Sequence, residues 1–231
     1  MTRVALVTGV SRPQGIGHAI AHRLHAQHVD LFLHHYETYS GFPDVPHLDL
    51  DLTMPTAPQE LIDAVMSAYG RLDVLVCNHA LDGHDGPLAE MTAATLDTHW
   101  AVNTRSSILL TKAFASVASA GGRVIYLTSG QDNGPMVNEI AYAASKGALA
   151  SIVRSLSAAL APREITVNAV NPGPTDTGWA TPEIYEAVRK QFPTGRWGTP
   201  DDAARLIAWL ASEDASWVTG QVITSEGGFG R

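Results

Sequence analysis

Residues 8–17 read Thr-Gly-Val-Ser-Arg-Pro-Gln-Gly-Ile-Gly and directly follow the first apolar run of the chain, Arg3–Thr8, which is typical of a buried strand. Glycines in such a turn let the backbone approach a pyrophosphate, and the free amides of a following helix start give that anion a positive end. The alternative is an ordinary Gly-rich turn between a strand and a helix. The stretch favours a βα unit that opens a nucleotide-binding fold.

The rest of the chain continues this alternation of short apolar runs and longer helical patterns, which is the signature of βαβ units that feed a mostly parallel sheet. The predicted strands are residues 3–8, 30–34, 45–48, 73–77, 123–128, 165–170 and 221–224. The predicted helices are residues 15–27, 57–69, 94–119, 139–161 and 200–212, the last with Thr199 as N-cap and Pro200 at its first position. No linker divides the 231 residues, so we predict one α/β domain, 1–231.

The composition argues against several classes of function. A formal net charge of -8 offers no basic stripe to a phosphate backbone, so we do not expect nucleic-acid binding. No apolar run approaches the roughly 20 residues that cross a bilayer. Cys77 is the single cysteine, and strand-like sequence from Arg3 onward leaves no room for a signal peptide, so we expect a cytoplasmic protein.

Tyr142 and Lys146 lie four residues apart in the stretch Tyr-Ala-Ala-Ser-Lys. In a helix over 139–161, positions i and i+4 share a face, so the phenol and the ammonium would point into the same space. A core aromatic and a solvated lysine are the alternative reading. Behind a nucleotide turn, the pair favours a nicotinamide-dependent oxidoreductase, because reducing a ketone places negative charge on oxygen that a nearby acid must meet.

These motifs resemble the short-chain dehydrogenase/reductase family over essentially the whole chain. The family's Thr-Gly-x-x-x-Gly-x-Gly turn is matched by Thr8, Gly9, Gly15 and Gly17, with five residues instead of three between Gly9 and Gly15. The resemblance implies a Rossmann-type, doubly wound parallel sheet of seven strands in the order 3-2-1-4-5-6-7, with helices on both faces. It also implies NAD(P)-dependent activity on a small-molecule carbonyl or alcohol.

The resemblance extends to further cofactor segments. Asp51-Leu52 resembles the acidic site that holds the adenine ring, although Asp49-Leu50 competes for this assignment, and Asn78 is the retained residue of the family's Asn-Asn-Ala-Gly segment. In the Pro-Gly segment after the sixth strand, Thr175 or Thr177 would hold the nicotinamide carboxamide. The cofactor-binding residues implied are Gly9, Ser11, Arg12, Gly15, Ile16, Gly17, His35, Asp51, Leu52, Asn78, Tyr142, Lys146, Pro172, Gly173, Thr175 and Thr177.

The second predicted strand ends in Leu-His-His-Tyr, residues 33–36, without the Asp that would accept hydrogen bonds from a free ribose 2′-hydroxyl. Arg12 matches a basic position that in many family members pairs with the 2′-phosphate of NADP. We therefore expect NADP(H), with NAD(H) as the alternative. Residues 35–44 are too few for the usual crossover helix with its loops, so the enlarged glycine turn and the short crossover would together rebuild the adenosine pocket, lined by His35 or Tyr36.

The catalytic set implied by the resemblance is Asn103, Ser129, Tyr142 and Lys146. Tyr142 would be the acid in reduction and the base in oxidation, which near neutral pH requires its pKa to fall by roughly three units from about 10. Lys146 would supply positive charge and hydrogen-bond the nicotinamide ribose, and Ser129 would steady the substrate carbonyl. Asn103 would hold a water in a proton relay. The four-residue spacing departs from the enoyl reductases, whose Tyr and Lys lie further apart, and the halohydrin dehalogenases have Arg at the second position.

The substrate end is the least specified. Residues 174–197 would form a lid, in which Trp179, Tyr185 and Phe192 contact the substrate or simply pack. Within the family, the sequence most resembles proteins labelled 3-oxoacyl-acyl-carrier-protein reductases. An acidic carrier needs a basic landing surface, and Arg163 offers one place, but residues 118–120 carry no charge there. The sequence is compatible with either a small carbonyl compound or an acyl carbonyl compound as the substrate.

Two functions compete at this point. The first is an NADP(H)-dependent carbonyl reductase or alcohol dehydrogenase; the second is a non-catalytic nucleotide-binding regulatory protein on the same fold. The complete catalytic set favours the enzyme. The resemblance further implies a homotetramer built through the helices 94–119 and 139–161, with a dimer as second choice. We predict no metal site.

Overall fold

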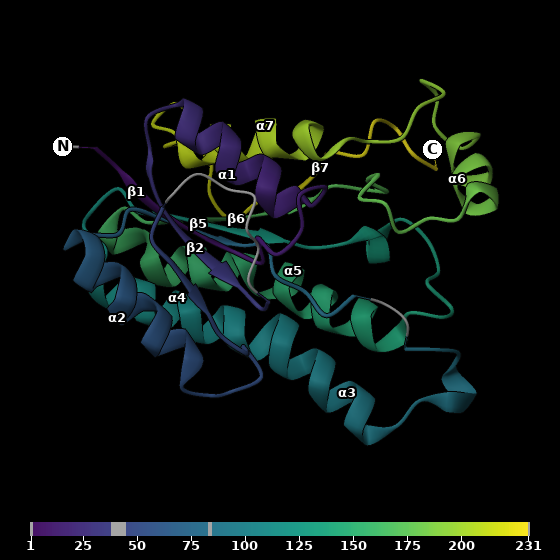
Figure 1. Ribbon diagram of the computed structural model, residues 1–231, viewed down its shortest axis with the longest axis horizontal. Helices are drawn as coiled ribbons and strands as arrows, with labels where there is room; N and C mark the ends of the chain where they lie inside the picture. The colour runs from purple at the N-terminus through teal and green to yellow at the C-terminus, as the bar shows by residue number, and fades with distance from the viewer. Residues whose placement is uncertain (1, 38–44, 83–84, 231) are drawn as a thin grey trace.

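The computed structural model describes residues 2–37, 45–82 and 85–230. Within these ranges, seven strands form one sheet in the order β3-β2-β1-β4-β5-β6-β7, and each neighbouring pair runs parallel (Figure 1). This confirms the predicted strand order and fold class. The strands are β1 (Val4–Thr8), β2 (Asp30–His35), β3 (His47–Asp49), β4 (Val74–Cys77), β5 (Arg123–Leu127), β6 (Thr166–Asn171) and β7 (Val222–Thr224).

Helices cover both faces of the sheet (Figure 1). One face carries α1 (Ile16–Ala26) and α7 (Pro200–Ala211), and the other carries α2 (Ala57–Tyr69), α4 (Ser106–Val117) and α5 (Ile140–Leu160). The remaining helices are α3 (Ala93–His99), the π-helix η2 (Trp100–Arg105), α6 (Pro182–Arg189), and the 3-10 helices η1 (Leu88–Glu90), η3 (Gly130–Asp132) and η4 (Ala161–Arg163).

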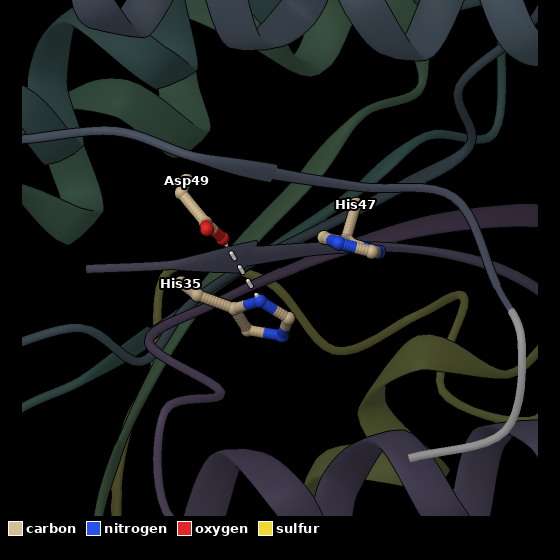
Figure 2. Close-up of side chains that lie close together, drawn as sticks. All are labelled: His35, His47 and Asp49. Carbon is tan, nitrogen blue, oxygen red and sulfur yellow. Dashed lines mark hydrogen bonds and ion pairs between the residues drawn. The ribbon is translucent and has the colours of Figure 1, made fainter. Parts of the chain in front are cut away.

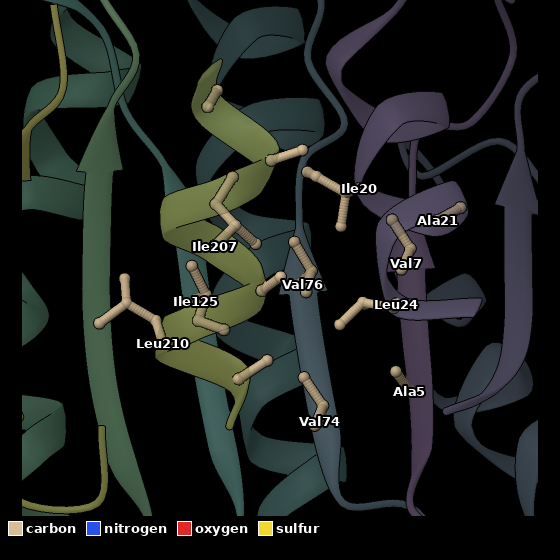
Figure 3. Packing of buried hydrophobic residues seen from close by; sticks show 14 of the residues in the cluster. Ala5, Val7, Ile20, Ala21, Leu24, Val74, Val76, Ile125, Ile207 and Leu210 are labelled. Atoms are coloured by element: carbon tan, nitrogen blue, oxygen red, sulfur yellow. The ribbon is translucent and has the colours of Figure 1, made fainter. Parts of the chain in front are cut away.

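Alternation along the strands builds two separate cores, because successive side chains of a strand point to opposite faces. In β1, Ala5 and Val7 belong to the cluster under α1 and α7, whereas Val4 and Leu6 belong to the cluster over α2, α4 and α5. Figure 3 shows the first cluster, in which Ile20 of α1 and Ile207 of α7 meet the strands. Burying each such side chain contributes roughly 1.5–3 kcal/mol.

Two helices differ from the sequence-based prediction. The predicted helix 94–119 is divided into α3, the π-helix and α4. Helix α6 was not predicted, although Thr181 caps it by accepting a hydrogen bond from the Ile184 amide and Pro182 follows at the first position. The same Thr-Pro signal starts α7, where Thr199 and Asp202 complete a capping box, as predicted for its N-cap.

The connection between β2 and β3 is described only at residues 36–37 and 45–46, and these four residues are not helical. The predicted loss of the crossover helix otherwise falls on residues 38–44, which lie outside the described ranges, so it stays a prediction. Among the described residues, no helix has the length and apolar character that spanning a membrane requires.

Candidate active site

Three predicted catalytic side chains meet at the carboxyl end of β5. Ser129 follows this strand, while Tyr142 and Lys146 occupy neighbouring turns of α5. The side chains of Tyr142 and Ser129 are hydrogen-bonded. The Lys146 ammonium lies 6.0 Å from the centroid of the Tyr142 ring. The shared helix face expected from the four-residue spacing is therefore present.

Lys146 is a buried cation, with 1% of its surface exposed. Its Nζ donates to the carbonyl of Leu127, the last residue of β5, at 2.9 Å and lies 3.5 Å from the carbonyl of His79. Burial lowers the pKa of Lys146 to about 8, against a smaller opposite effect of Cys77. The two carbonyls hold the positive charge close to the tyrosine ring.

The environment of Tyr142 moves its pKa upward, to about 12. Burial is the main cause, the hydrogen bond with Ser129 acts in the opposite direction, and the negative charges of Glu139 and Asp82 raise the pKa further. The predicted lowering of this pKa, to which the charge of the oxidised nicotinamide contributes, stays a prediction, and burial and these carboxylates, which sequence spacing does not reveal, act against it. The phenol keeps its proton at neutral pH.

Asn103 lies in the π-helix η2, a helix type found frequently at functional sites. Its side chain is fully buried, and its Oδ1 accepts from the Leu81 amide at 2.7 Å. Its Nδ2 donates to the Leu81 carbonyl at 3.0 Å and to Ser145 Oγ at 2.9 Å. Ser145 Oγ in turn donates to the Tyr142 carbonyl at 2.7 Å. The amide thus links η2 to the turn of α5 that carries the tyrosine.

Asp85 is a site residue that the sequence reasoning missed. Its Oδ2 accepts from the Tyr142 amide at 3.1 Å and from the Ala141 amide, so it satisfies amides in the first turn of α5. Glu139, at the N-cap position, provides no side-chain cap of its own. Because the capping carboxylate comes from 57 residues away, no local pattern indicated it.

The glycine turn brings β1, β4 and α1 close together. A Cβ on Gly17 would lie 2.6 Å from Asn78 Nδ2, and a Cβ on Gly9, whose φ is +73°, would lie 2.6 Å from the His79 Cα. Asn78 Nδ2 donates to the carbonyls of Thr8 and Gly9, each at 3.0 Å. These contacts give both glycines a steric reason, and through them Asn78 holds the glycine turn against the end of β4.

The start of α1 suits a pyrophosphate. Among the described residues, no side chain caps this helix at Gly15, and its first turn holds no acidic residue to compete with an anion. The enlarged turn folds back on itself, since the Gly15 amide donates to the Arg12 carbonyl at 3.0 Å. Ile16 is the first residue of the helix. The geometry fits the phosphate end of a dinucleotide.

The same turn touches the end of β2. The Tyr36 amide donates to Ser11 Oγ at 3.0 Å, and the Val10 amide donates to the His34 carbonyl at 3.0 Å. Arg12 is exposed beside this junction. The enlarged turn and the residues that begin the short crossover are therefore neighbours, as the adenosine-pocket hypothesis requires.

Asp49 and Asp51, the two candidates for the acidic residue that holds the adenine ring, differ in their surroundings. Asp49 ends β3, and its Oδ1 contacts His35 Nδ1 at 3.2 Å. Asp51 lies beyond the strand, exposed, and its Oδ1 accepts from the Thr53 amide at 2.8 Å, next to buried Leu52. The His35 side chain is therefore turned toward β3 and Asp49. The carboxylate of Asp51 is held by the turn that it forms with Thr53.

The segment after β6 is held by its own contacts. The Gly173 amide donates to Asn171 Oδ1 at 3.0 Å, and a φ of +63° with a Cβ position 2.5 Å from Glu226 Cβ explains the glycine that follows Pro172. The Thr175 hydroxyl donates to the Gly173 carbonyl at 3.2 Å and the residue is buried. Thr177 is half-buried.

The aromatic residues predicted for the lid mostly pack on one another. Trp197 is buried, stacks on Tyr185 with ring centroids 5.0 Å apart, and donates from Nε1 to the Tyr185 carbonyl at 2.9 Å. Phe192 is also buried beside Trp197. Trp179 is different, with 49% of its surface exposed. Figure 1 shows that α6, which carries Tyr185, lies apart from α1 and α7.

His79 is a second residue without a sequence signal. It is buried, and its Nδ1 lies 2.7 Å from Thr8 Oγ1 while its Nε2 lies 2.8 Å from Ser106 Oγ. Burial and the nearby positive charge of Lys146 lower its pKa well below the usual value, so the ring is neutral. His79 joins Thr8, at the start of the glycine turn, to α4. The alanine that stands at this position in the family's Asn-Asn-Ala-Gly segment has no side-chain group that could make these hydrogen bonds.

Comparison with known proteins places this arrangement among oxidoreductases. A family model described as "Enoyl-(Acyl carrier protein) reductase" matches residues 9–230. The "Uncharacterized oxidoreductase YjdA" of Bacillus subtilis is 42% identical, over 98% of this chain and 96% of that protein. A short-chain dehydrogenase from Burkholderia cenocepacia, solved in complex with NADP, is 32% identical with a TM-score of 0.87, over 98% of this chain and 97% of the other.

A third similar protein is the reductase LugOII, whose structure is titled for keto-reduction at C1 during lugdunomycin biosynthesis. It is 33% identical with a TM-score of 0.87, over 99% of this chain and 98% of the other. Each of these matches covers nearly the whole chain.

The depressed pKa of Lys146 predicts a pH dependence of stability. Folded Lys146 loses its proton near pH 8 and unfolded lysine near 10.5, so between these values the unfolded chain binds more protons and stability rises with pH. Relative to a Lys146→Met variant, the wild-type free energy of unfolding should rise by about 3 kcal/mol across this window, as measured by urea unfolding. A Lys190→Met control, at the exposed C-cap of α6, should follow the wild type. Parallel profiles for wild type and Lys146→Met would contradict the assignment.

Proposed function

The chain belongs to the short-chain dehydrogenase/reductase family of NAD(P)-dependent enzymes, and we propose that it interconverts a ketone and a secondary alcohol with NADP(H). The observation that carries this proposal is the convergence of Ser129, Tyr142 and Lys146 at the end of β5. The keto-reduction named for LugOII supports the choice of a ketone as substrate.

The chain's own residues supply a place for the cofactor. The glycine turn, with its uncapped helix start, would bind the pyrophosphate, and Asp51 would bind the adenine. Asn78 would keep the glycine turn in place through its hydrogen bonds to the turn. Of the two threonines, we choose Thr177 for the carboxamide, because the Thr175 hydroxyl already donates to Gly173. When bound, the nicotinamide supplies or accepts the hydride.

Proton transfer falls to Tyr142. Its pKa of about 12 keeps the phenol protonated at neutral pH, which suits an acid that donates to a ketone oxygen as negative charge develops there. Ser129, hydrogen-bonded to the phenol, would hold the same oxygen. The Lys146 cation stabilises the phenolate left behind, and the reverse reaction uses that phenolate as the base. Asn103 would act as a positioning residue through Ser145, with its water-holding role as the alternative.

The substrate is narrowed by two observations. The family model is described by enoyl reduction, but the four-residue spacing of Tyr142 and Lys146 is that of the ketone-reducing members. Arg163, the basic residue suggested for carrier binding, donates to the carbonyl of uncharged Ala118. We therefore favour a free carbonyl compound over a carrier-linked one, covered by a lid at residues 174–197 of a single domain.

Replacement of Tyr142 by Phe tests the proton donor. With a panel of ketones and NADPH, Tyr142→Phe should lower kcat by about 10²–10⁴-fold, because general acid catalysis contributes that much. Tyr69→Phe, at the distant end of α2, is the matched control and should retain activity. NADPH binding, followed by its fluorescence, should survive in both variants.

Two results would count against this assignment. Equal turnover in wild type and Tyr142→Phe would remove the tyrosine from the chemistry. Cofactor binding by the wild type without turnover on any ketone or alcohol of the panel would favour the non-catalytic regulatory alternative.

Arg12 should set the preference for NADPH over NADH. Hydrogen bonds to a charged group contribute about 1.5–3 kcal/mol, so Arg12→Ala should reduce the ratio of kcat/KM for NADPH to that for NADH by roughly tenfold or more. Arg205→Ala removes an exposed arginine of α7 and should leave the ratio unchanged. An unaltered ratio in Arg12→Ala would leave the preference to other residues of the adenosine end.

We also propose a homotetramer, with a dimer as second choice, formed through α4 and α5. Both helices keep an outward surface, at Lys112 and Ser116 of α4 and at Ser151, Arg154 and Ser155 of α5. Sedimentation at micromolar concentration should show four-chain particles. Particles of one chain only at that concentration would refute the proposal.

A further inference from the structure

A histidine–aspartate cluster lies where the carboxyl end of β2 pairs with the short strand β3. Figure 2 shows the side chains of His35, His47 and Asp49 turned toward one another. Each offers one potential ligand atom, and these three atoms lie within 4.8 Å of one another. The ring centroids of His35 and His47 are 5.2 Å apart.

Strand register explains the convergence. His35 of β2 is paired with Asp49 of β3, and His47 precedes Asp49 by two residues on the same strand. Residues two apart on a strand point to the same face, so His47 and Asp49 share a face with the paired histidine. The grouping is therefore fixed by backbone pairing and not by a flexible loop.

His35 differs from the other buried histidines nearby in its hydrogen bonds. In His34, Nδ1 accepts from the Gly9 amide at 3.2 Å and Nε2 donates to the Leu50 carbonyl at 3.0 Å, and both nitrogens of His79 are also engaged. His35 is 2% exposed, and its Nε2 has no hydrogen-bond partner among the described residues. The nitrogen of His35 that faces Asp49 is Nδ1, 3.2 Å from Oδ1, so Nδ1 is the ligand atom that His35 turns toward the cluster.

The tautomer of His47 leaves one ring nitrogen able to bind a metal ion. Its Nδ1 lies 3.2 Å from the Val45 carbonyl, and a carbonyl only accepts, so Nδ1 carries the proton. Nε2 then keeps its lone pair. Metal-binding histidines commonly donate their second ring N–H to a backbone carbonyl in this way, which fixes the ring.

We propose that His35, His47 and Asp49 form a zinc-binding site that joins the edge strand β3 to β2. Two imidazole nitrogens and one carboxylate oxygen are a donor set that Zn²⁺ accepts, with the fourth tetrahedral position left for water. Bond lengths of about 2.0–2.1 Å place tetrahedral ligand atoms roughly 3.3 Å apart, so the three atoms must draw together by up to about 1.5 Å. The side chains of His47 and Asp49 are exposed, which leaves them room to do so.

This site goes beyond the proposed reaction and departs from the sequence-based prediction of no metal. Three ligands that are separated along the chain, at positions 35, 47 and 49, did not form a recognisable metal-binding spacing. The register of β2 and β3 brings them together. Bound zinc would stabilise the folded chain, because the unfolded chain does not hold the three ligands near one another.

The experiment uses untagged full-length protein freed of metal by a chelator and then dialysed. Titration with zinc chloride in a calorimeter should show one ion per chain, and thermal unfolding should move upward by several degrees with zinc. His47→Ala and Asp49→Asn alter exposed side chains and should each weaken zinc binding by about a hundredfold or more, because even outer-shell partners contribute 10–100-fold.

His22→Ala is the matched control, since His22 is exposed on α1 and its ring lies 4.3 Å from that of His18, the other close histidine pair on this face. Its zinc affinity should equal that of the wild type. The proposal is overturned if the wild type binds no zinc, if His47→Ala and Asp49→Asn bind as tightly as the wild type, or if His22→Ala alone loses binding. None of these readouts depends on turnover, so they stand apart from the test of Tyr142.

Discussion

The buried ammonium of Lys146 is the interaction on which the arrangement of the site depends. Removing a cation from water costs several kcal/mol, and here the carbonyls of Leu127 and His79 offset part of that cost. Leu127 is the last residue of β5 and His79 follows the neighbouring strand β4, so the lysine fixes the position of α5 against the sheet. Tyr142, one turn earlier on the same helix, is thereby placed beside Ser129.

Two further polar contacts hold the same helix from other directions. Asp85 accepts hydrogen bonds from backbone amides in the first turn of α5. Asn103, in the π-helix, donates a hydrogen bond to Ser145 of α5. Each of these side chains is buried and hydrogen-bonded, so each would leave costly unpaired groups if the helix shifted. The phenol of Tyr142 is therefore carried by a firmly held helix, whereas the aromatic segment around α6 is held together by the stacking of Tyr185 on Trp197.

Local patterns were sufficient for much of this architecture. The glycine turn, the Thr199 cap and the spacing of Tyr142 and Lys146 each involve residues near one another in the chain, so their physical meaning was readable. Contacts between distant segments were not, as in Asp85 capping α5 or His35 facing β3. Burial was also hidden from local patterns, as at Tyr142, where it raises the pKa of the phenol. Helix α6 was missed despite a readable signal, since Thr181-Pro182 repeats Thr199-Pro200.

The packing of α1 against α7 joins the first helix of the protein to its last. Ile20 and Leu24 of α1 share a core with Ile207 of α7, and Arg23 pairs with Asp201. At about 5–20 residues per second, a ribosome needs roughly 10–35 s to add the intervening chain. For that interval the nascent α1 presents its apolar side without its final partner, and transiently exposed apolar surface of this kind favours aggregation of newly made chains.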